Sequence, residues 1–537
     1  MSPTRVSRIP HLLAFCTLLV CRSRAESILI KGGTVVNAEV SQISDVFIKD
    51  GLIEAVGPSL KGDADTRIIN AEGKYVMPGG IDPHTHLDAP MMGTISIDDF
   101  ASGQGAALAG GTTMNIDFAL PIQGDIAKGF KRYQDVSKRA VMDYGLHMAI
   151  TDWNDKVSSD MEKLTKEGIN SFKFFLAYKG AMAVTDEQLL KGLRRSKELG
   201  ALPMIHCENT EGLVDAQERT FSQGFTGPEG HYISRPATLE DEGTARAMYL
   251  AKYVNTPIYV VHVMSKGAAA EIAAAKLRGQ RVIGETIASG IAAEEGKIWD
   301  PDFKVAAAFV MSPPIRNKEH QDGLKAAVAG GVLDIIATDH CPFNSTQKRM
   351  GIHDFRSIPN GVNGIEERMH IAWDTLVNTG KAHILSTRQP ALASGIITPS
   401  AFVGVTSTAV AKAFNAFPRK GALAAGSDAD VIILDPKAKH TISASTHHSR
   451  IDTNIYEGRE VTGKVVVTVS QGKVVWENEK LNVKEGAGRF IKLPTGGELF
   501  AGLAEQDETA IARAFPYGVP GKPVQRDLTE KPSRDEL

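Results

Sequence analysis

The chain has 537 residues, too many for one compact core but suited to a barrel of ordinary size with a smaller second domain. Hydrophobic residues make up 42% and charged residues 23% of the sequence, which excludes disordered, collagen-like and multi-span membrane proteins. The net charge of −3 offers no basic surface for nucleic acid, and no run of Lys and Arg predicts a membrane-surface patch. We therefore expect a small-molecule partner.

The two ends of the chain carry sequences that resemble targeting signals. Residues 1–25 are predicted to be a secretory signal peptide, because Arg5 and Arg8 precede an apolar run over residues 11–21 that is too short to span a bilayer. A frayed or transit-like extension is the alternative interpretation. Residues 534–537 read Arg-Asp-Glu-Leu and resemble the K-D-E-L retrieval tetrapeptide, with Arg in the first place. Together the two signals predict a protein of the endoplasmic-reticulum lumen.

Short alternating apolar and polar runs near both ends predict a small β-sandwich made from two distant segments, residues 26–76 and 420–490. A barrel over residues 77–419 is then inserted between them. From residue 491 to residue 537 Gly, Pro and charged residues dominate, which predicts an arm or tail that packs on a neighbouring subunit. The expected strands of the sandwich are 28–30, 46–48, 53–56, 430–434, 464–469 and 473–476.

The middle of the chain alternates strand-like runs with helical stretches, which is typical of parallel βαβ units. The capping box Thr185-Asp186-Glu187-Gln188 opens one helix and Gly200 closes it, so residues 201–206 form the next buried strand. Eight such strands predict an α/β fold of the TIM (β/α)₈ type. They are expected at 76–81, 112–117, 146–150, 171–175, 203–206, 258–262, 282–285 and 333–338.

Potential metal ligands fall at or just past the C-terminal ends of these strands, which is the catalytic face of such a barrel. His84 and His86 follow the first strand, and residues two apart in an extended segment point to the same side. His206, His262 and Asp339 end the fifth, sixth and eighth strands. A core or surface histidine is the alternative for each imidazole, and a helix N-cap for the aspartate. Their joint arrangement favours a metal site.

Lys173 lies inside a predicted strand and shares its inward face with Ser171 and Phe175. A bare ammonium buried there is costly, so the side chain either extends to the rim or loses its charge. A neutral lysine can react with CO₂ to form a carbamate, whose two oxygens can bridge two cations about 3.5–4 Å apart.

Neither the cysteines nor the glycosylation sequon predicts further chemistry. Cys207 and Cys341 are the only cysteines after the signal peptide, so there is no disulfide framework, and both are expected to be small apolar fillers. The sequon at Asn344 lies so near the proposed site that we expect it to be unglycosylated.

Several segments carry a resemblance to a known family. They include P-G-G-I-D-P-H-T-H, S-F-K-F-F-L-A-Y-K-G, M-I-H-C-E-N, V-V-H-V, M-S-P-P-I-R and A-T-D-H-C-P-F, in family order. Over about residues 27–490 the chain resembles the dihydropyrimidinase and hydantoinase branch of the amidohydrolase superfamily. The segment from Gly230 to Arg235 also matches, and we expect it to be structural.

The resemblance implies a site with two Zn²⁺ ions and a homotetrameric assembly. Tyr178 matches the tyrosine that hydrogen-bonds the substrate carbonyl, while Ser312 and Asn360 match positions whose backbone groups hold the ring amide. Aromatic packing and turn formation are the alternatives for these three residues. The implied ligands are His84, His86, Lys173 as N6-carboxylysine and Asp339 for one ion, and Lys173, His206 and His262 for the other.

The activity implied by the resemblance is zinc-dependent opening of dihydrouracil, dihydrothymine or hydantoins to N-carbamoyl amino acids, with Asp339 moving the proton. Allantoinase, dihydroorotase and non-catalytic scaffold proteins are the alternatives. Dihydroorotases resemble H-x-H-x-R, whereas this chain has Asp88 in that place, which disfavours an anionic substrate. The choice of ring is expected to depend on the loops around Met91, Met92 and Phe175.

Overall fold

The computed structural model describes residues 27–378 and 395–514. Among these residues, none of the helices combines the length and apolar character needed to cross a membrane. The expected signal peptide and the retrieval tetrapeptide lie outside the described residues.

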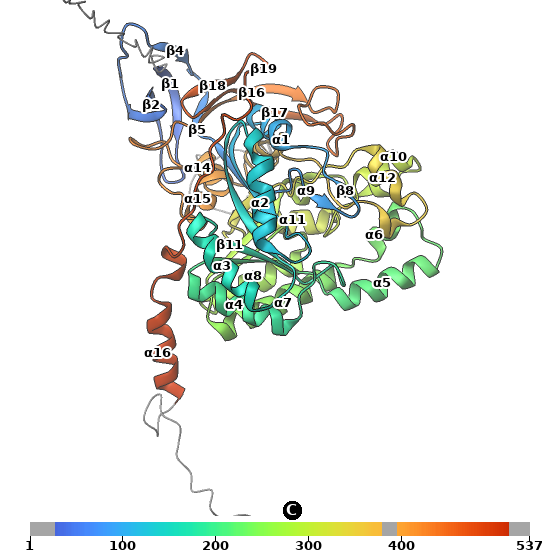
Figure 1. The fold of residues 1–537 in the computed structure, drawn as a ribbon. Helices are drawn as coiled ribbons and strands as arrows, with labels where there is room; N and C mark the ends of the chain where they lie inside the picture. The colour runs from blue at the N-terminus through green and yellow to red at the C-terminus, as the bar shows by residue number, and fades with distance from the viewer. Residues whose placement is uncertain (1–26, 379–394, 515–537) are drawn as a thin grey trace, which may run out of the picture.

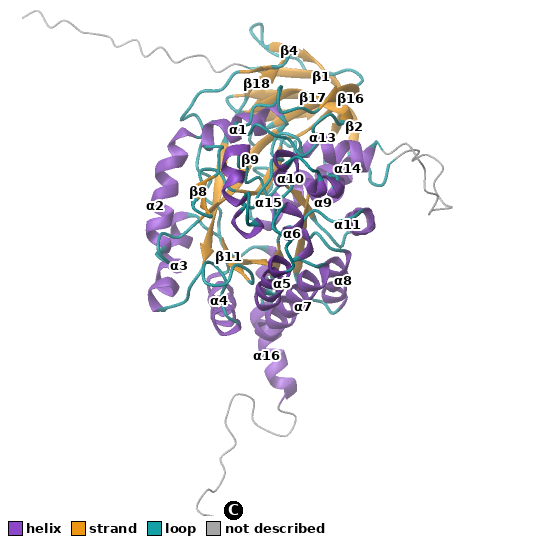
Figure 2. Cartoon of the chain, turned by 90° about the vertical axis from the view of Figure 1, so that its right-hand side faces the viewer, coloured by secondary structure: helices purple, strands orange, loops and turns teal. Residues whose placement is uncertain are grey.

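The centre of the molecule is a barrel of eight parallel strands in the order β6-β9-β10-β11-β12-β13-β14-β15, so the predicted (β/α)₈ fold is confirmed. A parallel bridge between Thr85 and His340 connects the first strand to the end of the last. Figures 1 and 2 show the helices arranged around these strands. The barrel strands are β6 (Gly80–Thr85), β9 (Thr112–Ala119), β10 (Asp143–Ile150), β11 (Ser171–Phe175), β12 (Leu202–His206), β13 (Ile258–Val260), β14 (Val282–Ile287) and β15 (Ile335–Ala337).

The first barrel strand differs from the prediction, which placed it at residues 76–81. That run is divided between β5 (Tyr75–Pro78), which pairs with strands of another sheet, and β6, which pairs with β9. The chain passes from one sheet to the other at Gly79, where a Cβ atom would lie only 2.1 Å from Oγ1 of Thr113. Only glycine allows this close passage.

The helices follow the barrel strands and bury one face against them. The predicted capping box is confirmed in α4, where Thr185 and Gln188 exchange side-chain and backbone hydrogen bonds and Gly200 ends the helix with φ 64°. The longer helices are α1 (Phe100–Ala109), α2 (Ile126–Val136), α3 (Asp155–Glu167), α4 (Asp186–Leu199), α5 (Thr210–Ser222), α7 (Ala237–Val254), α8 (Lys266–Leu277) and α11 (Lys318–Ala329). The shorter ones are α6 (Pro228–Ile233), α9 (Ala288–Ala292), α10 (Phe303–Ala308), α12 (Ser345–Lys348), α13 (Arg368–Ala372), α14 (Pro399–Val403) and α15 (Ala409–Ala413).

A second sheet of nine strands combines the two ends of the described chain, as predicted, in the order β19-β18-β17-β16-β5-β1-β2-β3 with β4 beside β1. Antiparallel pairing of β5 with β16 joins the N-terminal strands to the C-terminal ones, and Figure 1 shows them side by side above the barrel. The other strands are β1 (Ile28–Val36), β2 (Ser41–Lys49), β3 (Leu52–Gly57), β4 (Arg67–Asn70), β16 (Val431–Thr441), β17 (Glu460–Ser470), β18 (Lys473–Glu477) and β19 (Lys480–Leu481).

The segment after this sheet returns to the barrel. Ile491 and Leu493 are buried, and their backbone N–H groups donate to the carbonyl oxygens of Tyr144 and Gly168. Helix α16 (Leu503–Ala514) then extends away from the body in both views, with Asp507 accepting a hydrogen bond from Lys197 at 2.5 Å. The segment predicted to be an arm therefore contacts the barrel from Ile491 as far as Asp507.

Candidate metal centre and substrate pocket

One pocket opens at the C-terminal ends of the barrel strands, and the residues predicted for metal and substrate binding converge on it although they are spread over more than 270 positions of the chain. Met91 and Phe175, expected near the ring of the substrate, line it as well. The predicted residues that line the pocket are His84, His86, Lys173, Tyr178, His206, His262, Ser312, Asp339 and Asn360.

His84 lies in β6 and His86 directly follows that strand, so both rings reach the carboxylate of Asp339. Oδ1 of Asp339 is 3.2 Å from Nε2 of His84 and 3.1 Å from Nε2 of His86. The other ring nitrogen of His84, Nδ1, donates to Oε1 of Glu285 at 2.7 Å. This hydrogen bond leaves the lone pair of Nε2 free to face the pocket.

His206 and His262 make the other half of the centre. Nε2 of His262 lies 2.8 Å from Nδ1 of His206, so two ring nitrogens point at the same place. Nε2 of His206 donates to Glu208 at 2.7 Å, and Glu208 accepts a second hydrogen bond from Arg235 at 2.6 Å. Burial is the main reason that the pKa values of both histidines are lowered, which keeps them in the neutral form that binds metal.

Lys173 is a buried amine that forms no ion pair with a carboxylate in the part of the chain that the structure describes. Its side chain is 1% exposed, so the alternative in which it reaches solvent at the rim is excluded. Nζ lies 4.8 Å from the ring centre of Phe118 and 5.2 Å from that of Phe175, and none of the described carboxylates is within 4.0 Å of it. Burial lowers the pKa of Lys173 to about 8.

The backbone of the pocket is strained at three of these residues. Tyr178, His262 and Asp339 have φ values of 69°, 36° and 53°, in the left-handed region that favours glycine. Each such residue costs on the order of 1–3 kcal/mol unless its surroundings hold it, and such residues cluster at functional sites. Ligand atoms of His84, His262 and Asp339 lie within 4.8 Å of one another, and carboxylates stand behind two of the histidine rings of the pocket, which fits a metal centre.

Comparison with known proteins agrees with this geometry. Residues 75–475 match the amidohydrolase family. The chain is 53% identical over 511 residues to dihydropyrimidinase of Arabidopsis thaliana, covering 95% of this chain and 92% of that protein. It is 43% identical over 493 residues to dihydropyrimidinase of Rattus norvegicus, covering 90% and 92%. The crystal structure of dihydropyrimidinase from Brevibacillus agri superposes with a TM-score of 0.83 at 40% identity, covering 88% of this chain and all (100%) of that one.

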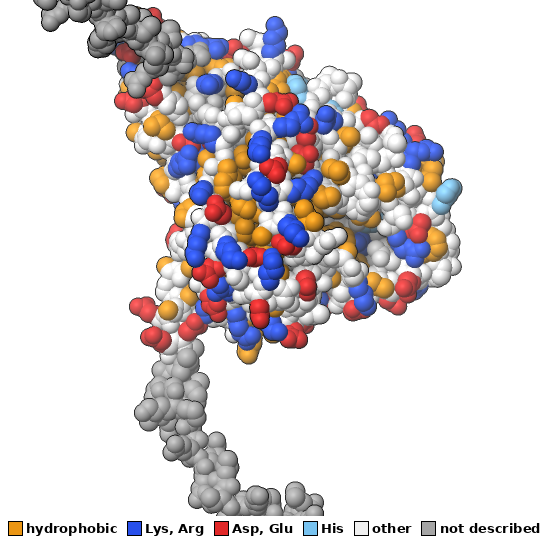
Figure 3. Space-filling view, viewed as in Figure 1, with side chains coloured by type: hydrophobic (Ala, Val, Ile, Leu, Met, Phe, Trp, Pro, Cys, Tyr) orange, Lys and Arg blue, Asp and Glu red, His pale blue; other side chains and the backbone are white. Residues whose placement is uncertain are grey.

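The chain belongs to the dihydropyrimidinase and hydantoinase branch of the amidohydrolase family. It is accordingly a metal-dependent enzyme that acts on a small molecule. In Figure 3 the acidic and basic side chains of this amidohydrolase are intermixed, and the face shown carries no continuous basic patch.

The substrate side of this amidohydrolase pocket holds Tyr178, Ser312 and Asn360. Nδ2 of Asn360 donates to Oγ of Ser312 at 3.0 Å, which joins the two segments. Burial raises the pKa of Tyr178, so its hydroxyl stays protonated and can donate a hydrogen bond. His231 donates from Nε2 to the carbonyl of Met311 at 2.7 Å and thereby supports the segment of Ser312.

Three supporting residues of this amidohydrolase were not predicted from the sequence as part of the site. Glu285 and Glu208 orient the rings of His84 and His206, and Arg235 neutralises Glu208. Glu285 lies in the seventh barrel strand, so the rule that singled out Asp339 could have found it. The segment from Gly230 to Arg235, expected to be structural, supports both halves of the pocket.

Proposed function

We propose that this chain opens the ring of 5,6-dihydropyrimidines, dihydrouracil and dihydrothymine, and of hydantoins by hydrolysing a cyclic amide bond, in pyrimidine catabolism. The products are N-carbamoyl amino acids. The observation that carries the proposal is the convergence of the histidines, Lys173 and Asp339 on one pocket in a chain 53% identical to a dihydropyrimidinase.

The centre is proposed to hold two Zn²⁺ ions bridged by Lys173 as N6-carboxylysine. The buried amine supports this modification, because a pKa of about 8 leaves part of it neutral and able to attack CO₂ with release of a proton. The resulting carbamate anion would add a second negative charge to that of Asp339 in the site. The proposed ligands are His84, His86, Lys173 and Asp339 for one ion, and Lys173, His206 and His262 for the other.

The side chains of the pocket account for the proton movements of the reaction. Zinc held by these residues would lower the pKa of a water molecule and polarise the carbonyl of the substrate. Asp339 accepts a proton from this water while the water oxygen bonds to the amide carbon. The ring C–N bond then breaks, and the carboxylic acid of Asp339 returns the proton to the departing nitrogen.

Tyr178, Ser312 and Asn360 are proposed to hold the ring. The protonated hydroxyl of Tyr178 donates to the carbonyl oxygen as that oxygen gains negative charge, which stabilises the transition state more than the substrate. Backbone groups of Ser312 and Asn360 are proposed to bind the ring amide.

The position of Asp88 disfavours the dihydroorotase alternative. Asp88 does not line the pocket, and its Oδ2 accepts a hydrogen bond from the backbone N–H of Phe100 at 3.2 Å, so this position supplies no cation for an anionic substrate. The intact set of ligand side chains disfavours a non-catalytic scaffold.

The proposal is tested by assaying the purified full-length protein for hydrolysis of four cyclic amides: dihydrouracil, a hydantoin, allantoin and dihydroorotate. We expect hydrolysis of dihydrouracil and of a hydantoin, loss of activity on chelation and recovery with Zn²⁺, with about two zinc ions per chain by elemental analysis. Preferred turnover of allantoin or dihydroorotate would refute the substrate assignment. A stable, metal-free and inactive protein would instead support the scaffold alternative.

We also propose that the protein resides in the endoplasmic-reticulum lumen and assembles as a homotetramer. The support is the sequence of residues 1–25 and 534–537 for the location, and family resemblance for the assembly. Fractionation of cells that express the chain with and without residues 534–537 tests the location, and light scattering tests the assembly. Secretion of both forms at equal rates would refute retrieval.

A further inference from the structure

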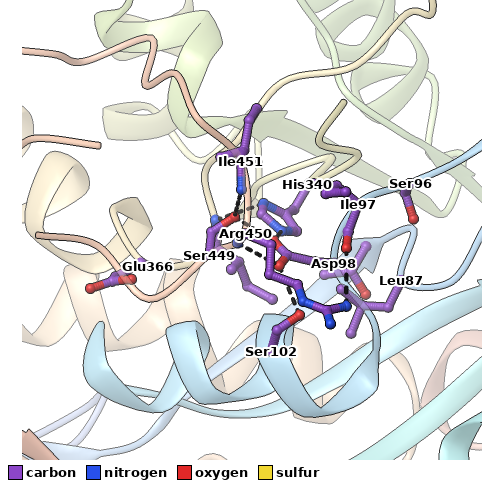
Figure 4. Close-up of polar contacts among 12 residues, drawn as sticks. Leu87, Ser96, Ile97, Asp98, Ser102, His340, Glu366, Ser449, Arg450 and Ile451 are labelled. Carbon is purple, nitrogen blue, oxygen red and sulfur yellow. Dashed lines mark hydrogen bonds and ion pairs between the residues drawn. The ribbon is translucent and has the colours of Figure 1, made fainter. Parts of the chain in front are cut away.

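Asp98 is a fully buried carboxylate that lies behind the pocket and does not line it. It belongs to the loop between the first barrel strand and α1. Oδ1 accepts hydrogen bonds from Oγ of Ser102 at 2.8 Å and from the backbone N–H of Arg450 at 2.9 Å. Oδ2 accepts from Nε2 of His340 at 3.0 Å and from Oγ of Ser449 (Figure 4). All four partners donate, so the site requires an acceptor on both oxygens.

His340 is fixed at both ring nitrogens. Nδ1 accepts from the backbone N–H groups of Gly364 at 3.2 Å and Ile365 at 3.4 Å, so the ring proton must be on Nε2, where it is donated to Asp98. The backbone of His340 is held as well, because its carbonyl oxygen accepts from the N–H of His86 at 2.9 Å. His340 therefore connects the loop of a proposed metal ligand to the segment that follows Asn360.

Asp339 immediately precedes this fixed histidine and has a φ of 53°. A non-glycine residue keeps such a backbone conformation only when its neighbours hold it there. His340 is that neighbour, since its ring and its backbone have partners on three different segments. The orientation of Asp339 toward His84 and His86 thus depends on the ring of His340 and, through it, on Asp98.

We propose that Asp98 and His340 are positioning residues that hold Asp339 in the orientation needed for proton transfer, and that Ser449 and Arg450 complete this support from the C-terminal segment. The inference rests on the proposed role of Asp339. It gives the C-terminal segment, more than 100 residues further along the chain, an indirect part in catalysis, because its contacts with Asp98 help to hold the carboxylate of Asp339.

The variant Asp98→Asn tests this inference in the zinc-loaded full-length enzyme. The amide NH₂ of asparagine would face a donor on whichever side it lies, and a change of the His340 tautomer would set a proton against Gly364 and Ile365. We expect kcat for dihydrouracil to fall about ten- to hundredfold, while KM and zinc content stay within about twofold. The solvent deuterium isotope effect on kcat should rise, because proton transfer becomes slower relative to the other steps.

Asp160→Asn is the matched control. Asp160 is a buried aspartate of α3 whose carboxylate pairs with Lys156 and Lys163, and it does not line the pocket. The same chemical change there should leave kcat and the isotope effect near their wild-type values. His340→Gln, which keeps a donor for Asp98, should retain more of kcat than His340→Ala.

Three results would overturn the inference. They are a wild-type kcat in Asp98→Asn, a loss of kcat that only follows a loss of zinc, or equal losses in His340→Gln and His340→Ala. If Asp98→Asn does not fold, Ser449→Ala removes one of the four donors and should lower kcat about three- to tenfold at unchanged KM. An unchanged kcat in that variant refutes the inference.

If the wild-type enzyme itself turns over none of the rings, the proposed function fails. The orientation of Asp339 can still be tested in crystal structures of the zinc-loaded wild type and Asp98→Asn. A displaced Asp339 carboxylate supports the positioning role, and an unmoved one overturns it.

Discussion

Two buried clusters at opposite ends of the barrel each bring three possible metal ligands together beside a lysine, but they differ in how their charge is balanced. At the C-terminal rim, ligand atoms of His84, His262 and Asp339 lie within 4.8 Å of one another; near the start of β10, those of Asp143, Asp428 and Asp430 do the same. A buried lysine accompanies each cluster. Geometry alone would assign a metal to both.

The lysines separate the two clusters. Lys420 lies 2.5 Å from Asp143 and 2.9 Å from Asp428 and also contacts Asp430, so its ammonium group occupies the place that a metal ion would take. Burial alone would lower the pKa of Lys420, but the three carboxylates raise it above its usual value. Lys173 has no such partner and its pKa is lowered. We call Asp143, Asp428 and Asp430 with Lys420 the closed cluster, and we expect it to stabilise the fold. We call the ligands around Lys173 at the C-terminal rim the open cluster, which remains able to bind a metal ion.

The largest effect should come from the open cluster. Lys173→Ala removes the proposed bridge and should lower kcat by about a thousandfold or more, as loss of several kcal/mol of metal assistance predicts. Activity assays with metal analysis measure this, and short carboxylic acids that take the place of the carbamate should restore part of the activity. Lys191→Ala, an exposed lysine of α4, is the control. Full activity in Lys173→Ala would remove the bridging role.

The closed cluster should respond in stability. Lys420→Met leaves three buried carboxylates without their shared cation and should cost about 3–5 kcal/mol of unfolding free energy in urea titrations. Zinc content and kcat per folded molecule should not change. The same substitution at Lys439, which forms an exposed ion pair with Glu460, should cost less than about 1 kcal/mol. A Lys420→Met variant that is as stable as the wild type but loses zinc would contradict the assignment of a stabilising role to this cluster.

Replacement of Glu285, which supports the histidines of the open cluster, should have an intermediate effect on zinc binding. The oxygens of Glu285 accept from Nδ1 of His84 at 2.7 Å, from the N–H of His262 at 2.8 Å and from the hydroxyl of Tyr259 at 2.5 Å. Glu285→Gln turns an NH₂ group toward one of these donors and should weaken zinc binding about 10- to 100-fold in chelator competition. Glu162→Gln, in a glutamate of α3 that pairs with Lys166 and Arg195, should bind zinc normally, and equal affinities in both variants would contradict the role of Glu285.

The smallest expected effect is a change in the free energy of unfolding at acidic pH. Burial alone would raise the pKa of Asp143, but Arg489 and Lys420 outweigh it and hold the pKa below the usual 3.8. A lowered pKa stabilises the fold above the unfolded-state value and loses that contribution as the pH falls through the folded-state value. The stability gap between wild type and Asp143→Asn should therefore narrow between pH 5 and pH 3, by on the order of 1 kcal/mol. A gap independent of pH would mean that Asp143 is not ionised.

Much of the open cluster could be predicted from the sequence, because parallel strands in a barrel bring their C-terminal ends together. His206 and Asp339 needed only this rule and their positions at the ends of apolar runs. The closed cluster could not be predicted: Asp143, Lys420 and Asp430 lie in separate elements, and no local periodicity indicates that they meet.

The boundary between the two sheets and the residues that support the metal ligands could not be predicted from the sequence either. The apolar run over residues 76–81 carries no mark of the passage between two sheets, since strand pairing is decided by partners far along the chain. Nothing in the local sequence distinguishes Glu208 and Arg235 from other polar residues, and only the fold places them behind His206.

The sequence by itself determined the order of strands and helices and which side chains reach the rim, because periodicity and strand direction are local properties. Only the tertiary structure decided what each buried charge does. Lys173 and Lys420 are the same residue type with similar burial, and their roles differ because the pKa of a buried amine depends on which carboxylates the fold places beside it.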